Sequence, residues 1–288
     1  MRPAQIEIVN VFTHNGQGGN PCPIMVDASE LSSEEMRAIA AHHGHESAFV
    51  TAALSEGFDY TFRFYVPRHE MEMCGHATIG ALWLLAAQGV LKGPHVRIDT
   101  RSGPVSGFVD LVSRDNPSVE ITQPAGRVFD LSRDGEAEVL RTLGLARADP
   151  LDLPIQNAIT SRVKTLIPMR LVERLNALDM NTALIEACCT RIGSTGLYPY
   201  AIESRDKRTF EARQFPKSSG YPEDAATGIA ATALSFGLLR NALIDANDAP
   251  IRSAARPNDG RLSEIRVRLG FSGGRAIGCL LGGTVGRA

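Results

Sequence analysis

Three short polar segments of the sequence carry side chains that could move protons: Glu46, residues 74–76 and residues 223–228. Carboxylates, imidazoles and thiols are the side chains that most often serve as general acids and bases. Each segment adjoins an apolar run, so we expect each at the end of a strand or helix, where side chains commonly face clefts. The sequence therefore points first to acid–base chemistry.

Glu46 is the leading candidate for the general acid and base. It directly precedes residues 47–51, a short apolar run that predicts a strand. A carboxylate that accepts a proton and then returns it needs a pKa near neutrality, and burial among apolar groups raises the pKa of a carboxyl group. The neighbours at 48–50 are apolar. Such a scheme requires neither a metal nor redox chemistry.

The two later polar segments each precede a run of apolar or small residues, Ala77–Ala87 and Ile229–Leu239. A helix that is apolar on every side must be enclosed by other structure. A helix N-terminus presents unpaired N–H groups and partial positive charge, so both segments could bind a carboxylate. The alternative is that Asp224 and Thr227 only cap their helix.

The same order of elements occurs twice along the chain. Tyr60–Val66 and Thr209–Phe215 each predict a strand that a proline stops, and each strand leads through a polar loop to an enclosed helix. We interpret this as an internal duplication that gives two similar α/β halves with a cleft between them. The register between the halves stays open, and coincidence between two strand–loop–helix units is the alternative.

The domain boundaries follow from composition. We place the first half at residues 1–115 and the second at 116–274, because charge and turn residues increase from Asp115 and Asn116-Pro117 marks a break. The last strand, Ile277–Leu281, is expected to return to the first half, so that residues 275–288 complete it.

Two local elements complete the outline. Ser32 to Glu35 has the spacing of a capping box, which predicts a helix over Ser33–His43 that ends at Gly44. Ile6–Val9 predicts the first strand.

The composition argues against several classes of protein. The net charge of −2 over 288 residues gives no broad attraction to nucleic acid or anionic lipid. No apolar run is long enough to span a bilayer, and residues 1–10 lack the features of a signal peptide. The five cysteines are odd in number and form no CxxC pair, which favours reduced thiols in the cytoplasm over disulfides or a structural zinc site.

Two further patterns could indicate a nucleotide or metal site. Residues 16–21 contain three glycines but fit neither nucleotide-binding fingerprint, so we expect a flexible turn that ends in a rigid Asn-Pro. Three histidines within residues 42–45 lie beside Glu46, but Phe49 stands where the HExxH zinc motif needs its second histidine. We expect solvated histidines at a helix end, and no metal or nucleotide.

With these segments in view, the sequence resembles the PhzF-like family, named for a phenazine biosynthesis isomerase and sharing the diaminopimelate epimerase fold. Four segments carry the resemblance, and together they run from the first strand to the second enclosed helix: 11–13 with 19–21, 46–50, 74–78, and 223–228. Each segment alone is weak, whereas their order and spacing together are specific.

The resemblance implies an α+β fold of two pseudo-symmetric domains, each a curved, mostly antiparallel sheet around a central helix, with the active site between them. It implies Glu46 as the general acid and base, with His76 and Asp224 as further catalytic residues. Asn20 and Thr227 would contact a small carboxylic-acid substrate, and backbone amides near Gly75 and Gly228 would receive its carboxylate. It implies no cofactor, and a homodimer is a further expectation.

Two departures from the family pattern concern the substrate. The family often has proline after the aspartate and serine after the glycine of the last motif, where this chain has Ala225 and Ile229. Because Ile229 has no hydroxyl group, contacts with the substrate must differ there.

Cys74 leaves two other functions open. Related two-base epimerases use a cysteine from each half, and Cys74 would take the first position, but no cysteine lies near Ala225 in the second half. We expect Cys74 to be a small packing residue. The alternatives to an isomerase are a lyase or one-base epimerase that uses Cys74, and a binding protein without turnover.

Overall fold

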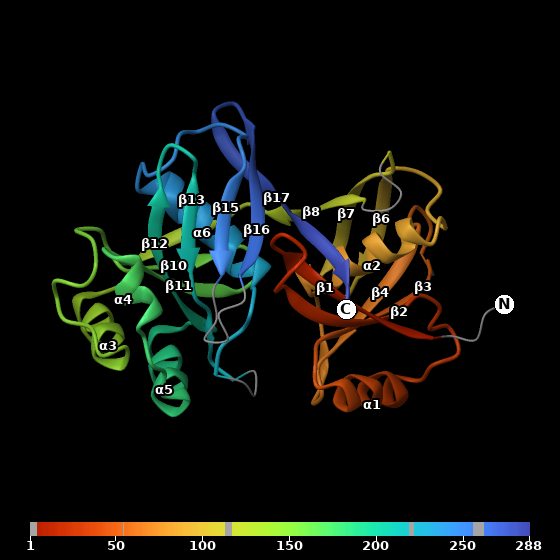
Figure 1. Ribbon diagram of the computed structural model, residues 1–288, viewed down its shortest axis with the longest axis horizontal. Helices are drawn as coiled ribbons and strands as arrows, with labels where there is room; N and C mark the ends of the chain where they lie inside the picture. The colour runs from red at the N-terminus through yellow and green to blue at the C-terminus, as the bar shows by residue number, and fades with distance from the viewer. Residues whose placement is uncertain (1–4, 54, 113–116, 219–221, 256–261) are drawn as a thin grey trace. The chain divides into compact units, whose positions relative to one another are not determined.

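The structure is a computed structural model that describes residues 5–53, 55–112, 117–218, 222–255 and 262–288 (Figure 1). Contacts divide the chain into two compact units. The first comprises Met1–Thr122 and Leu281–Ala288, and the second comprises Gln123–Leu280. The boundary expected at Asn116-Pro117 falls partly outside the described residues, because these ranges omit Asn116.

The first unit has the helices α1 (Ser33–His43) and α2 (Gly75–Ala87). Its strands are β1 (Ile6–Thr13), β2 (Asn20–Met25), β3 (Ser47–Ala52), β4 (Tyr60–Tyr65), β5 (Glu70–Met71), β6 (His95–Thr100), β7 (Gly103–Asp110) and most of β8 (Ser118–Pro124). The end of β17 (Arg275–Arg287) pairs antiparallel with β1.

The second unit has the helices α3 (Arg133–Thr142), α4 (Val172–Asn176), α5 (Thr182–Ile192) and α6 (Gly228–Arg240). Its strands are β9 (Arg127–Asp130), β10 (Gln156–Ile159), β11 (Val163–Met169), β12 (Gly196–Ser204), β13 (Thr209–Ala212), β14 (Phe215–Pro216), β15 (Ile251–Ala255), β16 (Ser263–Ser272) and the start of β17.

Strand pairing repeats between the units. In the first, β1–β2 is antiparallel, β2–β3 parallel, β3–β4 antiparallel, β4–β6 parallel and β6–β7 antiparallel. In the second, β10–β11, β11–β12, β12–β13, β13–β15 and β15–β16 follow the same sequence of directions. Shared directions over five successive pairs support the duplication, and the predicted α+β fold class is confirmed.

Both predicted central helices are enclosed. In α2, every residue from Gly75 to Ala86 is buried, and the helix contacts β1, β2, β3 and β7 (Figure 1). In α6, burial is continuous from Ala230 to Leu238, with contacts to β9, β10, β11 and β16. A helix that is surrounded in this way needs apolar side chains on all faces, which explains the composition of both runs.

The two helices also fix the register of the duplication. Each has 13 residues and begins at a glycine, so Gly75 corresponds to Gly228. Thr227 then lies where the first unit has Cys74, and Ile229 lies where it has His76. The thiol and the imidazole therefore have no counterpart of their kind in the second unit.

The local predictions for the first unit are confirmed. Helix α1 covers the predicted residues, and Ser32 forms a complete capping box with Glu35. Residues 14–17 form a tight turn in which the backbones of His14 and Gln17 exchange two hydrogen bonds of 2.9 and 3.0 Å. Asn15 and Gly16 at its centre have φ of 51° and 75°, values typical of the Asn-Gly hairpin turn. A turn, rather than a phosphate loop, joins β1 to β2.

The prediction of one strand over Thr209–Phe215 is wrong. The strand β13 ends at Ala212, and Phe215–Pro216 forms a separate short strand that pairs with β12. The break falls at Arg213 and Gln214. The Arg213 N–H still donates to the carbonyl of Pro199 in β12 at 3.0 Å, but the backbone of Gln214 forms an isolated bridge with Asp224 instead of extending the ladder.

Candidate active site

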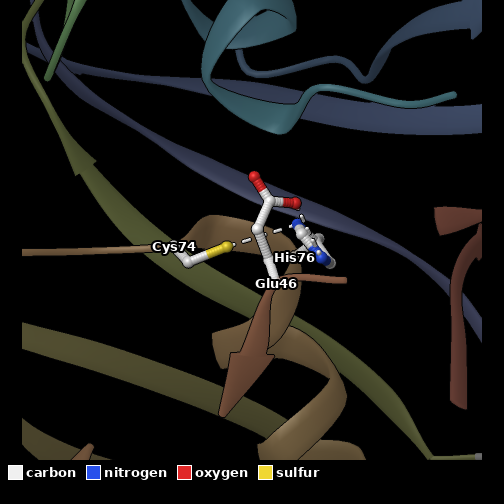
Figure 2. A group of neighbouring side chains, drawn as sticks. All are labelled: Glu46, Cys74 and His76. Atoms are coloured by element: carbon white, nitrogen blue, oxygen red, sulfur yellow. Dashed lines mark hydrogen bonds and ion pairs between the residues drawn. The ribbon is translucent and has the colours of Figure 1, made fainter. Parts of the chain in front are cut away.

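Glu46, Cys74 and His76 lie close together in the first unit (Figure 2). The Oε2 atom of Glu46 lies 3.6 Å from Nε2 of His76, and the Sγ atom of Cys74 lies 3.3 Å from Nδ1 of the same ring. Cys74 and His76 are buried, whereas 17% of the Glu46 side chain is exposed. The imidazole thus lies between a thiol and a carboxylate.

The two ring nitrogens of His76 have complementary roles in a neutral imidazole, since one donates and the other accepts. If the Cys74 thiol donates to Nδ1, the proton on the ring is at Nε2 and faces the Glu46 carboxylate. If Glu46 carries a proton instead, Nε2 can accept a hydrogen bond from the carboxylic acid, and the ring proton is then at Nδ1, facing Cys74. The arrangement is therefore compatible with both protonation states of Glu46, which a group that takes and returns a proton requires.

Local structure explains why these three side chains meet. Glu46 follows the end of α1, where Gly44 adopts the left-handed conformation with φ of 69°, and precedes the first residue of β3. Cys74 is the N-cap residue of α2. Its carbonyl oxygen accepts from the N–H of Thr78 at 3.0 Å and from the Thr78 hydroxyl at 2.7 Å, which fixes the backbone of the turn.

Cys22 is a second thiol beside this group. It is fully buried in β2, and burial raises the pKa of its thiol, with the negative charge of Glu46 raising it further. A thiol held neutral in this way does not supply a base. The sequence offered no signal for this neighbour, because it lies 24 positions before Glu46.

The predicted substrate-binding residues of the first unit lie at element starts. Asn20 is buried at the first position of β2, opposite Val11 of β1. Gly75 is the first residue of α2, and a Cβ atom there would lie 3.0 Å from Leu281. A larger residue at Gly75 would therefore disturb the turn that holds Cys74 and His76.

In the second unit, Asp224 and Thr227 also contact each other. The Thr227 hydroxyl donates to Oδ2 of Asp224, and the Asp224 N–H donates to the carbonyl of Gln214 at 3.0 Å. Thr227 is the N-cap residue of α6 but makes no side-chain cap bond. The alternative that the two residues only cap their helix therefore lacks support at Thr227, whose hydroxyl donates to the Asp224 carboxylate and makes no cap bond.

Sequence reasoning gave no role to Arg213 and Glu223. Their buried side chains form two parallel bonds, from Nε to Oε1 at 2.7 Å and from Nη2 to Oε2 at 2.8 Å. The third nitrogen, Nη1, donates to carbonyls at the end of α4: Leu175 at 3.2 Å, Asn176 at 3.2 Å and Leu178 at 2.8 Å. This pair ties the residue before Asp224 to the body of the second unit.

The predicted site residues thus form two groups. Glu46 and His76 lie together in the first unit, and Asp224 and Thr227 lie together in the second. The convergence of the two groups in one cleft stays a prediction.

The histidines beside Glu46 do not form the metal site that was considered. His42 and His45 are exposed, and His43 is half-buried at the end of α1. Burial lowers the pKa of His43, and the two neighbouring imidazoles lower it further. Among the described residues, Glu46, Cys74 and His76 are instead the group of three that could hold an ion, with one ligand atom each within 4.8 Å of the others.

All five cysteines lie within the described residues, all are buried, and none of them forms a disulfide. In the part of the chain that the structure describes, no helix has the length and apolar character needed to cross a membrane.

Comparison with known proteins decides the family. A sequence model of the PhzC-PhzF family, described as phenazine biosynthesis-like protein, matches residues 9–275. The chain belongs to this family. Among its relatives are an uncharacterized isomerase of Deinococcus radiodurans, 31% identical over 79% of this chain and 73% of its own length, and an uncharacterized isomerase of Clostridium acetobutylicum, 29% identical over 91% and 89%. The family resemblance read from the sequence is confirmed.

Solved structures agree on the fold of this PhzF-family chain. A PhzF-family phenazine biosynthesis protein of Bacillus anthracis matches with a TM-score of 0.87 at 22% identity, over 100% of this chain and 98% of that one. A hydroxyproline epimerase of Agrobacterium vitis with bound trans-4-hydroxy-L-proline matches with a TM-score of 0.67 at 14% identity, over 99% and 90%. At these identities the likeness shows the fold alone.

Proposed function

We propose that this PhzF-family protein is an isomerase that moves a proton on a small carboxylic acid, with Glu46 as the general acid and base. Family membership and the names of its relatives support the isomerase class. The observation that carries the assignment of residues is the contact of Glu46 with His76 at 3.6 Å. Glu46 takes a proton from one substrate carbon and returns it to another, so the acid is rearranged with no net gain or loss of atoms.

The neighbours of Glu46 support this role. His76 can donate to the carboxylate or accept from the carboxylic acid, which stabilises both states that occur in turnover. In the second unit, Ile229 takes the position that His76 has in the first, and Thr195, just before β12, takes the position of Glu46. Neither is an acid or base near neutral pH. The chemistry is therefore assigned to groups of the first unit.

The substrate carboxylate is proposed to bind at the N-termini of α2 and α6, near Gly75 and Gly228. The helices α1, α3 and α5 have side chains that accept from their first-turn N–H groups, whereas α2, α6 and the five-residue α4 begin without such a cap. Uncapped N–H groups favour an anionic ligand. Asn20 and Thr227 are proposed as further contacts, and Asp224 as the residue that orients the substrate.

Glu46→Gln is the direct test. Glutamine keeps the size of the side chain, so folding and ligand binding should survive, but it cannot exchange a proton. The rate should fall by about 10²–10⁴-fold or more. The measurement is hydrogen–deuterium exchange into cyclic dienoic and hydroxylated carboxylic acids in D₂O, followed by NMR. Glu34→Gln, at an exposed position of α1, is the matched control and should retain the rate of the parent protein.

Near-normal exchange in Glu46→Gln would rule out the shuttle. Asp224→Asn should behave differently, because it removes the charge that orients the substrate but not the proton carrier. We expect it to weaken substrate binding as well as the rate. Unchanged binding in Asp224→Asn would count against its proposed place in the site.

A one-base epimerase or lyase that uses Cys74 is the second candidate, because the thiol lies 3.3 Å from His76. Cys74→Ala distinguishes the two. An isomerase based on Glu46 keeps most of its exchange rate, whereas a Cys74-dependent enzyme loses it. A binding protein without turnover would show no exchange with any acid. The proposal requires no cofactor, so treatment with a chelator should not lower the rate. The homodimer stays a prediction that light scattering would check.

A further inference from the structure

We propose that Glu46, Cys74 and His76 also form a binding site for zinc, and that zinc bound there blocks the proton transfer. The blocking part rests on the proposed function, whereas the binding part does not. The donor set is a thiol, an imidazole and a carboxylate, which are the three side-chain groups that bind zinc in proteins. None of the three residues belongs to the histidine run at 42–45 that the sequence suggested.

The geometry is close to what zinc needs. Tetrahedral zinc bonds of about 2.0 Å to nitrogen or oxygen and about 2.3 Å to sulfur hold ligand atoms roughly 3.3–3.6 Å apart. The contacts of His76 with Cys74 and with Glu46 measure 3.3 and 3.6 Å. One ion takes only one ring nitrogen, so the widest separation, within 4.8 Å, must close by about 1 Å. Rotation of the Glu46 side chain, the most exposed of the three, supplies this movement.

The site is largely formed before the ion binds. Cys74 and His76 come from one helical turn, whose backbone Thr78 holds through two bonds to the Cys74 carbonyl. Both side chains are already buried, so little ordering accompanies binding. Zinc binds the thiolate form of cysteine, so its binding to Cys74 would release the thiol proton.

Three protein ligands leave one coordination position open. Among the described residues no fourth histidine, cysteine, aspartate or glutamate joins the group, so water or a small anion completes the shell. Such a site exchanges its ion instead of serving as a structural element. Once the Glu46 carboxylate is bound to zinc, its lone pair is no longer available to accept a proton from a substrate carbon. Zinc bound there therefore acts as an inhibitor.

The test uses the full chain, stripped of metal with a chelator and desalted. Cobalt is the spectroscopic probe, because a thiolate ligand gives a charge-transfer absorption, and zinc affinity is measured by calorimetry. We expect one ion per chain and a thiolate–cobalt band that zinc removes. Cys74→Ser should abolish the band and weaken zinc binding by about tenfold or more. Cys279→Ser, a buried thiol outside the group, is the control and should change neither.

The binding part and the blocking part of the proposal are contradicted by different results. No thiolate band, or equal zinc affinity in Cys74→Ser and the parent, would overturn the site. If Cys74→Ser does not fold, Glu46→Gln replaces it and must also weaken zinc binding by about tenfold. Proton exchange that persists with one zinc bound per chain would refute the blocking part and leave the proposed function intact. Zinc binding without exchange on any acid would refute the proposed function and leave the site intact.

Discussion

The buried ion pair of Arg213 and Glu223 should make the second unit sensitive to the loss of either charge. Glu223→Gln keeps the shape of the side chain and removes its charge, which leaves the guanidinium buried without its counter-charge. The loss of one partner of a buried pair costs about 3–5 kcal/mol. Because the three carbonyl bonds of Arg213 remain, we expect the lower end, about 3 kcal/mol.

This loss of unfolding free energy should lower the melting temperature of the second unit. For a unit of about 160 residues, each kcal/mol shifts Tm by roughly 2–4 °C, so Glu223→Gln should melt about 6–12 °C lower. Differential scanning calorimetry at pH 7 measures the shift. Asp130→Asn is the matched control, because Asp130 pairs with Arg240 at 2.9 Å on the surface of the same unit. An exposed pair is worth at most about 1 kcal/mol.

A double variant separates charge from packing. Arg213→Met with Glu223→Leu removes both charges, which by itself is often neutral, but it also removes the donor to three carbonyls at the end of α4. We expect the double variant to be more stable than Glu223→Gln yet less stable than the parent. If Glu223→Gln melts within about 4 °C of the parent, as Asp130→Asn should, the pair does not hold the segment before Asp224.

Three other predictions concern packing, pH and thiols. Gly80→Ala should destabilise the first unit by about 1–2 kcal/mol in urea unfolding, because the new Cβ atom would lie 3.0–3.1 Å from methyl groups of β1 and β2. Gly93→Ala is the control and should be neutral in the same assay, because nothing lies within 4 Å of its Cβ position. The hydrogen bond from Arg63 lowers the pKa of Glu70, so the pair stabilises the fold above the unfolded pKa, and this stabilisation is lost as pH falls through the lowered pKa of the folded protein. Glu70→Gln should therefore cost up to about 1 kcal/mol at pH 7, and in acid unfolding the difference should shrink below about pH 4 and vanish below that lowered pKa. Burial raises the pKa of Cys279 to about 12, which leaves about one molecule in 10⁴ with a thiolate at pH 8. Alkylation of Cys279, followed by mass spectrometry, should therefore be orders of magnitude slower in the folded protein than in urea.

Each prediction has an outcome that contradicts it. Equal unfolding midpoints for Gly80→Ala and Gly93→Ala would show that α2 can move away from the strands. A constant difference between Glu70→Gln and the parent down to low pH would mean that the ion pair is not its source. Rapid alkylation of Cys279 in the folded protein would show that β17 opens locally.

The sequence by itself determined what depends on nearby residues or on composition. The bounds of α1 follow from a capping box and a C-terminal glycine, both within one turn of the helix ends. The enclosure of α2 and α6 follows from their apolar residues on every face, because no water-facing side would be tolerated. The duplication follows from the repeated order of these elements. The four family segments added Glu46, His76 and Asp224 as candidates.

Only the tertiary structure decided which of these residues touch. Glu46 and His76 are 30 positions apart, and no local rule sets a distance between the start of β3 and the start of α2. Cys74 was expected to be a small packing residue near the site, and only the structure shows that this buried thiol contacts the imidazole of His76. Contacts across long stretches of chain depend on how sheets close around a helix, and this is set by the packing of the whole unit.

The same reason applies to polar residues of the second unit. The sequence left open whether Thr227 caps its helix, and only the structure shows that its hydroxyl donates to the carboxylate of Asp224 and makes no cap bond. The strand predicted over Thr209–Phe215 is interrupted because the backbone of Gln214 pairs with Asp224, ten positions later, and no local rule in the sequence names that partner. Burial was thus foreseeable from composition, whereas the partner that each buried polar group finds was decided by the fold.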